Sequence, residues 1–228
     1  MHQASRNAKR RQIVHMICPV LLAAILLLAV RGLLLTQVKL PAHTALPGLH
    51  GGERVWVSLT AYGLRLPGES LWGYHRWGHG TPQRGDAVVW QLPGNSRLST
   101  GVCRALPGDT IWADPARQKI LPARTSVDAV PFRVPEHGVP MAVNPANARL
   151  LAYLLHTYEG CPANVTPSGR LFLHGNECRK VRFTRDFYWM ETQPDVYLFI
   201  PHEALTGRIV GTLFARGARW PWIAPLPR

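Results

Sequence analysis

The chain has few acidic residues for its length. It carries 13 Asp and Glu against 26 Lys and Arg, which gives 228 residues a formal net charge of +13. A basic excess of this size usually indicates a phosphate-rich partner, either nucleic acid or lipid. The arginines are scattered and no nucleic-acid-binding motif is present. We therefore expect no nucleic acid as partner and favour an anionic membrane surface.

Long hydrophobic runs are also scarce, since the sequence has only one. Residues Ile13–Val30 are apolar and without a formal charge, and as a helix they would span about 27 Å, close to the bilayer core. The basic residues before this run favour a cytoplasmic N-terminus. A cleaved signal peptide would need a shorter apolar region and a small-x-small cut site. We therefore expect a single-pass protein of the cytoplasmic (inner) membrane, with its main domain on the outer side. The expected division is a basic cytoplasmic tail over 1–12, a transmembrane anchor over 13–36 and an extracytoplasmic domain over 37–228.

The four cysteines and ten histidines give little support for a metal site. The histidines show no metal-ligand spacing, and we expect neither a metal nor a cofactor. Cys103 falls in an apolar strand, where a free buried thiol is usual. Cys161 and Cys178 flank a hairpin-like segment, and a disulfide between them would close a loop of about 17 residues, worth roughly 3 kcal/mol. We expect this bond to form, with two free thiols as the alternative.

Glycine and proline, at 20 residues each, separate short apolar runs along most of the chain. This pattern predicts a mainly β domain with many turns. Helical periodicity appears once, where Asn144-Pro145 predicts a helix start and Gly160 an end. We expect one inserted helix over about 144–159, packed on a sheet. Its apolar stripe comprises Leu150, Leu151, Leu154, Leu155 and Tyr158.

Short strands next to Gly-acid turns form the most specific pattern. Gln83-Arg84-Gly85-Asp86 precedes the apolar strand Ala87–Trp90, and the strand Gly101–Ala105 leads into Leu106-Pro107-Gly108-Asp109. Upstream, the segment Leu40–Val55 contains Thr44 and a third turn ending in Gly52-Glu53. Further along, Phe199-Ile200-Pro201 closes the series.

In their order and spacing, these segments resemble the boxes of bacterial type I signal peptidases. Those enzymes are membrane-bound serine peptidases that cut leader peptides from exported proteins. The resemblance implies an antiparallel β domain at the outer face of a membrane, with membrane lipid and exported preproteins or leader peptides as partners. It also implies structural roles for Asp86, Pro107, Gly108 and Asp109.

The same resemblance places the catalytic positions on residues without the usual chemistry. The family's nucleophilic serine falls on Thr44, and the catalytic lysine falls on Gly101. Such a serine is activated by a neutral lysine amine, which Gly101 cannot supply. The extra methyl group of Thr44 also restricts χ1 and therefore the position of the hydroxyl.

The family's last box, Gly-Asp-Asn followed by Ser-x-Asp-Ser-Arg, is missing. Only Glu191–Leu198 stands between the preceding strand and Phe199, and this short segment is compatible with a closed or an open peptide groove. Substitutes for the lost base are poorly supported: His43 would face away from Thr44, and Cys103 has no identified base.

Three functions stay open at this point. The favoured one is a catalytically degenerate member associated with leader-peptide processing, which binds exported chains by β-strand addition or associates with an active paralogue. The second is an active membrane serine-type endopeptidase with a non-standard catalytic set. The third is an anchored β-domain with a purely structural role.

Overall fold

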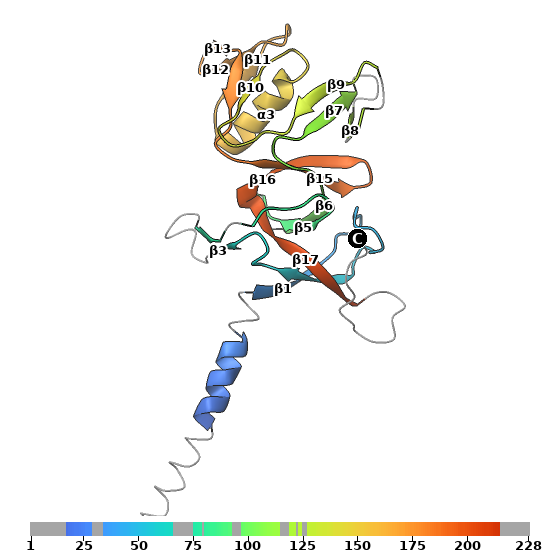
Figure 1. Ribbon diagram of the computed structural model, residues 1–228, viewed down its shortest axis with the longest axis vertical. Helices are drawn as coiled ribbons and strands as arrows, with labels where there is room; N and C mark the ends of the chain where they lie inside the picture. Colours follow the sequence, from blue (N-terminus) through green and yellow to red (C-terminus); the bar gives the residue numbers. More distant parts are fainter. Residues whose placement is uncertain are drawn as a thin grey trace, which may run out of the picture.

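The structure is a computed structural model, and its helices, strands and sheets are counted over the residues that it describes. These are residues 17–28, 34–65, 75–78, 80–92, 97–114, 119–121, 123–124 and 127–214. In Figure 1 the largest sheet occupies the lower part of the β domain, and a single labelled helix with several short strands lies above it. The predicted mainly β fold with one inserted helix is confirmed.

The predicted membrane anchor is covered only in part. Residues 17–28 are helical with exposed side chains, whereas 13–16 and 29–33 lie outside the described residues. Strand β1 (Leu35–Lys39) pairs with β2 (Arg54–Ser58) and includes the last two residues of the predicted 13–36 anchor. Across the described ranges, no helix combines the length and the apolar character needed to cross a membrane.

The central feature is a seven-stranded sheet in the order β1-β2-β17-β5-β6-β15-β16, with every pairing antiparallel. Both faces of this sheet are packed, which explains why Ala87–Trp90 is buried at every position. One face carries Val102 together with Leu46 and Val89. The other carries Cys103 together with Trp90 and Met190. The strands not yet given bounds are β5 (Ala87–Trp90), β6 (Ser99–Ala105), β15 (Phe187–Gln193), β16 (Val196–Pro201) and β17 (Leu205–Phe214).

Four smaller sheets extend the domain, and their strands are only two to five residues long. A 3₁₀ turn (His202–Ala204) links β16 to β17. The short strands reflect the frequent Gly and Pro residues, which end each run after a few positions. The smaller sheets are β3 (Leu64–Arg65) with β4 (Arg76–Trp77); β7 (Thr110–Asp114) with β8 (Lys119–Leu121) and β9 (Val130–Arg133); β10 (Pro140–Ala142) with β14 (Lys180–Arg182); and β11 (Ala163–Val165) with β12 (Leu171–Leu173) and β13 (Asn176–Cys178).

The inserted helix α3 (Ala148–Glu159) begins later than predicted and ends where predicted. Asn144 is not its N-cap, because the Oδ1 of Asn144 and of Asn147 each accept the backbone N–H of the other residue, closing a turn before the helix. Gly160 ends the helix in the left-handed conformation, with φ of 66°, which glycine adopts without steric cost.

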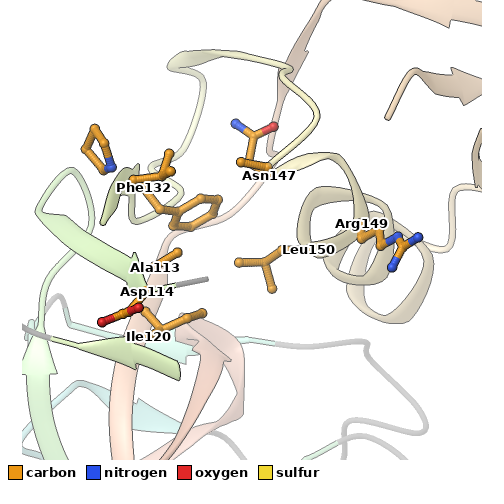
Figure 2. A pocket seen from close by; sticks show the side chains of 10 residues that line it. Ala113, Asp114, Ile120, Phe132, Asn147, Arg149 and Leu150 are labelled. Carbon is orange, nitrogen blue, oxygen red and sulfur yellow. The ribbon is translucent and has the colours of Figure 1, made fainter. Parts of the chain in front are cut away.

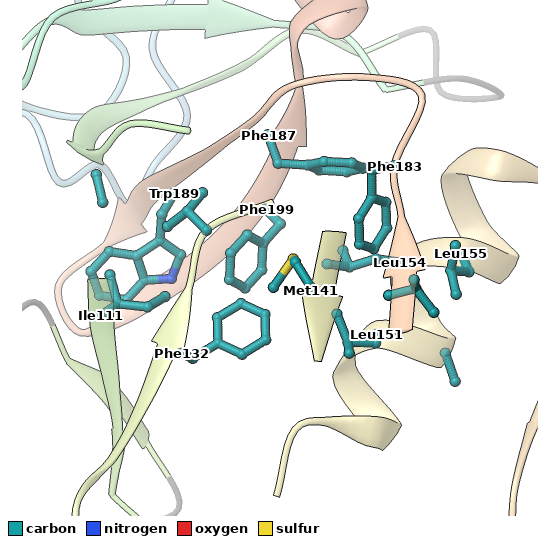
Figure 3. Close-up of a cluster of buried hydrophobic side chains, with 14 of the residues drawn as sticks. Ile111, Phe132, Met141, Leu151, Leu154, Leu155, Phe183, Phe187, Trp189 and Phe199 are labelled. Atoms are coloured by element: carbon teal, nitrogen blue, oxygen red, sulfur yellow. The ribbon is translucent and has the colours of Figure 1, made fainter. Parts of the chain in front are cut away.

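The predicted apolar stripe of α3 packs into the largest hydrophobic cluster of the domain. Leu151, Leu154 and Leu155 are buried there, and Figure 3 shows them facing the aromatic side chains of neighbouring strands. Tyr158 also donates a hydrogen bond of 3.1 Å from its hydroxyl to the carbonyl of Phe199. The helix is therefore tied directly to β16, the last strand of the large sheet.

The structure does not contain the expected Cys161–Cys178 disulfide, and it records both residues as free thiols. The strand register gives the reason. Cys178 lies opposite Leu171, which in turn lies opposite Val165. Cys161 comes before β11, on the side of Ala163, which lies opposite Leu173 and through it opposite Asn176, the other end of β13. Strand β12 therefore lies between the strand that follows Cys161 and the strand that carries Cys178.

Candidate functional site

The three Gly-acid turns share one hydrogen-bonding pattern. In each, the backbone N–H of the acidic residue bonds the carbonyl three positions earlier, and the acid's own carboxylate accepts the N–H of that earlier residue. The carboxylate bonds measure 3.1 Å for His50 to Glu53, 3.0 Å for Gln83 to Asp86 and 2.7 Å for Leu106 to Asp109. Each turn is therefore closed by two bonds.

Glycine is required at the third position of these turns. Gly52, Gly85 and Gly108 have φ of 90°, 89° and 84°, a region that other residues enter only with strain. Pro107 fixes φ at the position before Gly108, as expected in a type II turn. Glu53 makes the same contact as Asp86 and Asp109 with a longer side chain, so glutamate also closes this turn.

Two of the turns are also joined to each other and to the sheet. Arg84 donates from Nε to the carboxylate of Asp109 at 3.0 Å, and Asp86 accepts the hydroxyl of Tyr62 at 3.2 Å. Partial burial raises the pKa of Asp109, but the hydrogen bonds from Arg84 and from Leu106 N–H outweigh it and hold that pKa below its usual range. These contacts are structural and involve no reacting group.

Thr44, at the nucleophile position, lies in the loop after β1 and is partly buried. Its Oγ1 accepts the backbone N–H of Leu46 at 3.3 Å, so the hydroxyl is engaged within its own loop. His43 beside it is exposed. The next backbone N–H, that of Ala45, donates to the carbonyl of Thr192 at 3.2 Å.

Gly101, at the lysine position, lies in β6 opposite Val88 of β5. A Cβ atom at this position would overlap the carbonyl oxygen of Glu191 and would lie 2.8 Å from the ring of Trp90. Both neighbours are held in place, because Glu191 pairs with Val102 in the sheet and Trp90 is fully buried. Position 101 therefore has no room for any side chain.

Two consecutive residues of β15 contact the surroundings of Thr44 and of Gly101, the positions that the family resemblance implies as catalytic. Thr192 is hydrogen-bonded to the loop of Thr44, and its neighbour Glu191 lies against Gly101. The backbone of β15 therefore contacts the Thr44 loop at Thr192 and Gly101 at Glu191. Sequence reasoning did not find these contacts, because they depend on the register of β6 with β15 and not on any local motif.

Other groups that could supply chemistry are poorly placed. Cys103 is fully buried, and burial, with a smaller contribution from Asp86, raises the pKa of its thiol to about 12, so the thiolate is scarce at neutral pH. Lys39 is exposed on the edge strand β1, and Lys180 is exposed in a different sheet. Among the described residues, no group of three potential ligand side chains gathers to hold a metal.

A cavity of about 600 Å³ lies elsewhere in the domain, between the β7–β8–β9 sheet and the start of α3. Its walls are mainly apolar. Figure 2 shows Leu150 of α3 pointing toward Phe132 and Ile120 across the space. Neither Thr44 nor Gly101 lines this cavity.

The antiparallel β scaffold and its doubly closed Gly-acid turns agree with the fold that the resemblance to signal peptidases implies. The family model described as signal peptidase, peptidase S26 matches residues 11–212. The chain therefore belongs to the signal peptidase family, as the order of its boxes predicted. A search of curated proteins finds none that matches it.

Proposed function

We propose that this chain is a catalytically silent member of the signal peptidase family, which acts on exported proteins by binding and not by cleavage. The observation that carries the proposal is the lack of room for a side chain at Gly101. The general base of such a site must lie within hydrogen-bond reach of the nucleophile, and here the carbonyl of Glu191 and the ring of Trp90 occupy the place where its side chain would begin.

The surroundings of Thr44 support the same conclusion. Its hydroxyl accepts a hydrogen bond from Leu46 N–H, and without a base an alcohol of ordinary pKa is a weak nucleophile. The adjacent N–H of Ala45 is already bonded to Thr192, so it does not point freely at a reacting carbonyl as an oxyanion donor must. The hydroxyl of Thr44 therefore has no base to activate it, and the N–H of Ala45 is already used in a hydrogen bond.

The setting of this function is also a proposal. The apolar run and its basic flank support a single-pass anchor in the cytoplasmic membrane, with the β domain on the outer side. The expected partners there are membrane lipid, the leader peptides of exported preproteins and an active paralogue. The excess of basic residues supports contact with anionic lipid.

A cleavage assay tests the proposal. The full-length chain in detergent is incubated with a preprotein, beside an active type I signal peptidase as positive control, and products are identified by mass spectrometry. We expect no product at the leader site from the wild-type chain or from Thr44→Ala. The double variant Thr44→Ser with Gly101→Lys should also be inactive, because residue 101 has no space for the added side chain. Cleavage by the wild-type chain that Thr44→Ala abolishes would overturn the proposal.

A further inference from the structure

We propose that the cavity between the β7–β8–β9 sheet and the start of α3 binds a single-chain fatty acid. The aliphatic chain of this ligand lies between the two apolar walls, and its carboxylate lies at the start of the helix. The site is independent of the proposed silent function, because it shares no residue with the surroundings of Thr44 and Gly101.

The cavity has the size and the walls of a small-molecule site. Its volume of about 600 Å³ falls within the range of roughly 300–1,000 Å³ that is usual for ligand pockets. Figure 2 shows Leu150 on the helix side, pointing toward Phe132 and Ile120 on the sheet side. Apolar side chains on both walls favour a ligand with an apolar body, since its burial removes apolar surface from water.

Leu150 also explains why the cavity exists. It belongs to the apolar stripe of α3, but it is only half-buried, whereas Leu151 and Leu154 are fully buried in the largest hydrophobic cluster. The stripe is therefore wider than the cluster that it packs into. Part of the apolar face of the helix is left over for the cavity.

The start of α3 gives the cavity a positive rim. Arg149 lies in the first turn of the helix and is exposed, and that turn contains no acidic residue. Among the described residues, no carboxylate forms an ion pair with Arg149. The first backbone N–H groups of a helix also carry partial positive charge, so a basic residue there is unfavourable until an anion is bound.

The other polar groups at the cavity leave the rim as the place for an anionic head. The carboxylate of Asp114 is buried, and Figure 2 shows it directed away from Leu150. The side-chain amide of Asn147 is already used, because its Nδ2 donates to the carbonyl of Ala142 at 2.9 Å and its Oδ1 accepts the N–H of Asn144 at 2.8 Å. Figure 2 shows Arg149 on the far side of Leu150 from Phe132, so the guanidinium meets the head group at the rim and not inside.

The position of the cavity in the domain favours a free fatty acid over a phospholipid of the bilayer. In Figure 1, α3 and β9 lie at the opposite end of the β domain from β1, the strand that follows the proposed anchor. A two-chain lipid that stays in the bilayer beside the anchor does not reach this end. A single-chain fatty acid can leave the bilayer as a monomer.

Photolabelling tests the inference, with the full-length chain in phosphatidylcholine nanodiscs without free detergent. The probe is dodecanoic acid with a diazirine at the end of its chain, and labelled residues are located by tandem mass spectrometry. We expect the label on the cavity walls, at or beside Phe132 and Leu150. Unlabelled dodecanoic acid should displace the probe at a free concentration at least about tenfold lower than dodecanol, which lacks the negative charge.

Charge reversal at the rim gives a second measurement. Arg149→Glu should weaken binding of the probe at least about tenfold. Arg182→Glu is the matched control, because it makes the same change at an exposed position of β14 that does not line the cavity, and it should bind as wild type does. A glutamate in the first turn suits the helix dipole, so Arg149→Glu should unfold at a temperature no lower than wild type, which separates lost binding from lost folding.

The apolar part of the site has its own variant. Ala113 lines the cavity, and Ala113→Phe should fill the space and remove the label from the walls, with circular dichroism as the check on folding. Label confined to residues 17–28 would overturn the site, because the probe would then be in the lipid. Equal displacement by dodecanol and dodecanoic acid, or equal binding by Arg149→Glu and Arg182→Glu, would overturn the anionic head. None of these outcomes affects the proposed silent function, which the cleavage assay tests separately.

Discussion

The Gly-acid turns and the two expected catalytic positions of this chain differ in what the structure retains around them. All three turns keep their two closing bonds, even where glutamate replaces the usual aspartate at position 53. At Gly101, which the resemblance places at the lysine position, the backbone of β15 and the ring of Trp90 leave no room for a side chain. The difference shows that the groups that fold this domain and the groups that would perform its chemistry are separable, because the turn acids bond the backbone and not a substrate.

The largest expected effect on stability comes from removing a turn carboxylate. Asp86→Ala should lower the free energy of unfolding by about 3 kcal/mol, because it leaves the buried Tyr62 hydroxyl and the N–H of Gln83 without their acceptor. Urea unfolding followed by circular dichroism measures the loss. The exposed Asp128→Ala is the matched control and should change stability by less than about 0.5 kcal/mol. Similar losses in both variants would break the comparison.

Gly101→Ala should come next, with a loss of roughly 1–3 kcal/mol from overpacking. The added methyl group meets a backbone carbonyl that cannot move without disturbing the pairing of β15 with β6. Thermal unfolding of this variant and of Ser99→Ala, in the same strand, separates overpacking from a general effect of alanine in β6. A stable Gly101→Ala protein would mean that the lysine position is open after all.

Asp109 should give a smaller, pH-dependent effect. The pKa of Asp109 in the folded chain is below the usual value. The stabilisation that its carboxylate gives the folded chain is therefore present above the ordinary Asp pKa of about 3.9, and it is lost as the pH falls through the folded pKa. Asp109→Asn should therefore cost about 1 kcal/mol at neutral pH, since Arg84 is largely exposed. The difference from wild type should shrink below about pH 4. Unfolding measured across this range tests it, and a constant difference would contradict the assignment.

Thr44→Ala should have the smallest effect. The hydroxyl makes one local hydrogen bond of 3.3 Å, so its loss should change the free energy of unfolding by less than about 0.5 kcal/mol. Chemical denaturation in parallel with the Asp86 variant gives the contrast directly. A loss comparable to that of Asp86→Ala would show that the nucleophile position has become part of the structural framework.

Local signals in the sequence were enough to predict the secondary-structure types and the family to which the chain belongs. Gly160 ended the helix as expected because a left-handed C-terminal residue is a local requirement. The helix start was predicted too early, since Asn144 and Asn147 bond each other in a turn before the helix. The expected disulfide failed for a different reason: sequence spacing does not reveal that β12 lies between the strands near Cys161 and Cys178.

The state of the candidate site was harder to predict. The resemblance places the family's lysine on Gly101, but the sequence does not show how tightly this glycine is packed. That packing depends on where β15 registers against β6 and on Trp90 covering the glycine from the neighbouring strand. These are contacts between residues far apart in the chain, and periodicity or turn chemistry does not specify them.

The hydrogen bond from Tyr158 to Phe199 also has a consequence for the behaviour of the protein in solution. The outer strand of a sheet is a template on which other chains can stack and aggregate. On β16, the Phe199 carbonyl is already engaged by Tyr158, and Pro201 has no N–H to offer. The inserted helix therefore does more than fill the core, because it also occupies one of the backbone acceptors that this edge strand would otherwise offer to another chain.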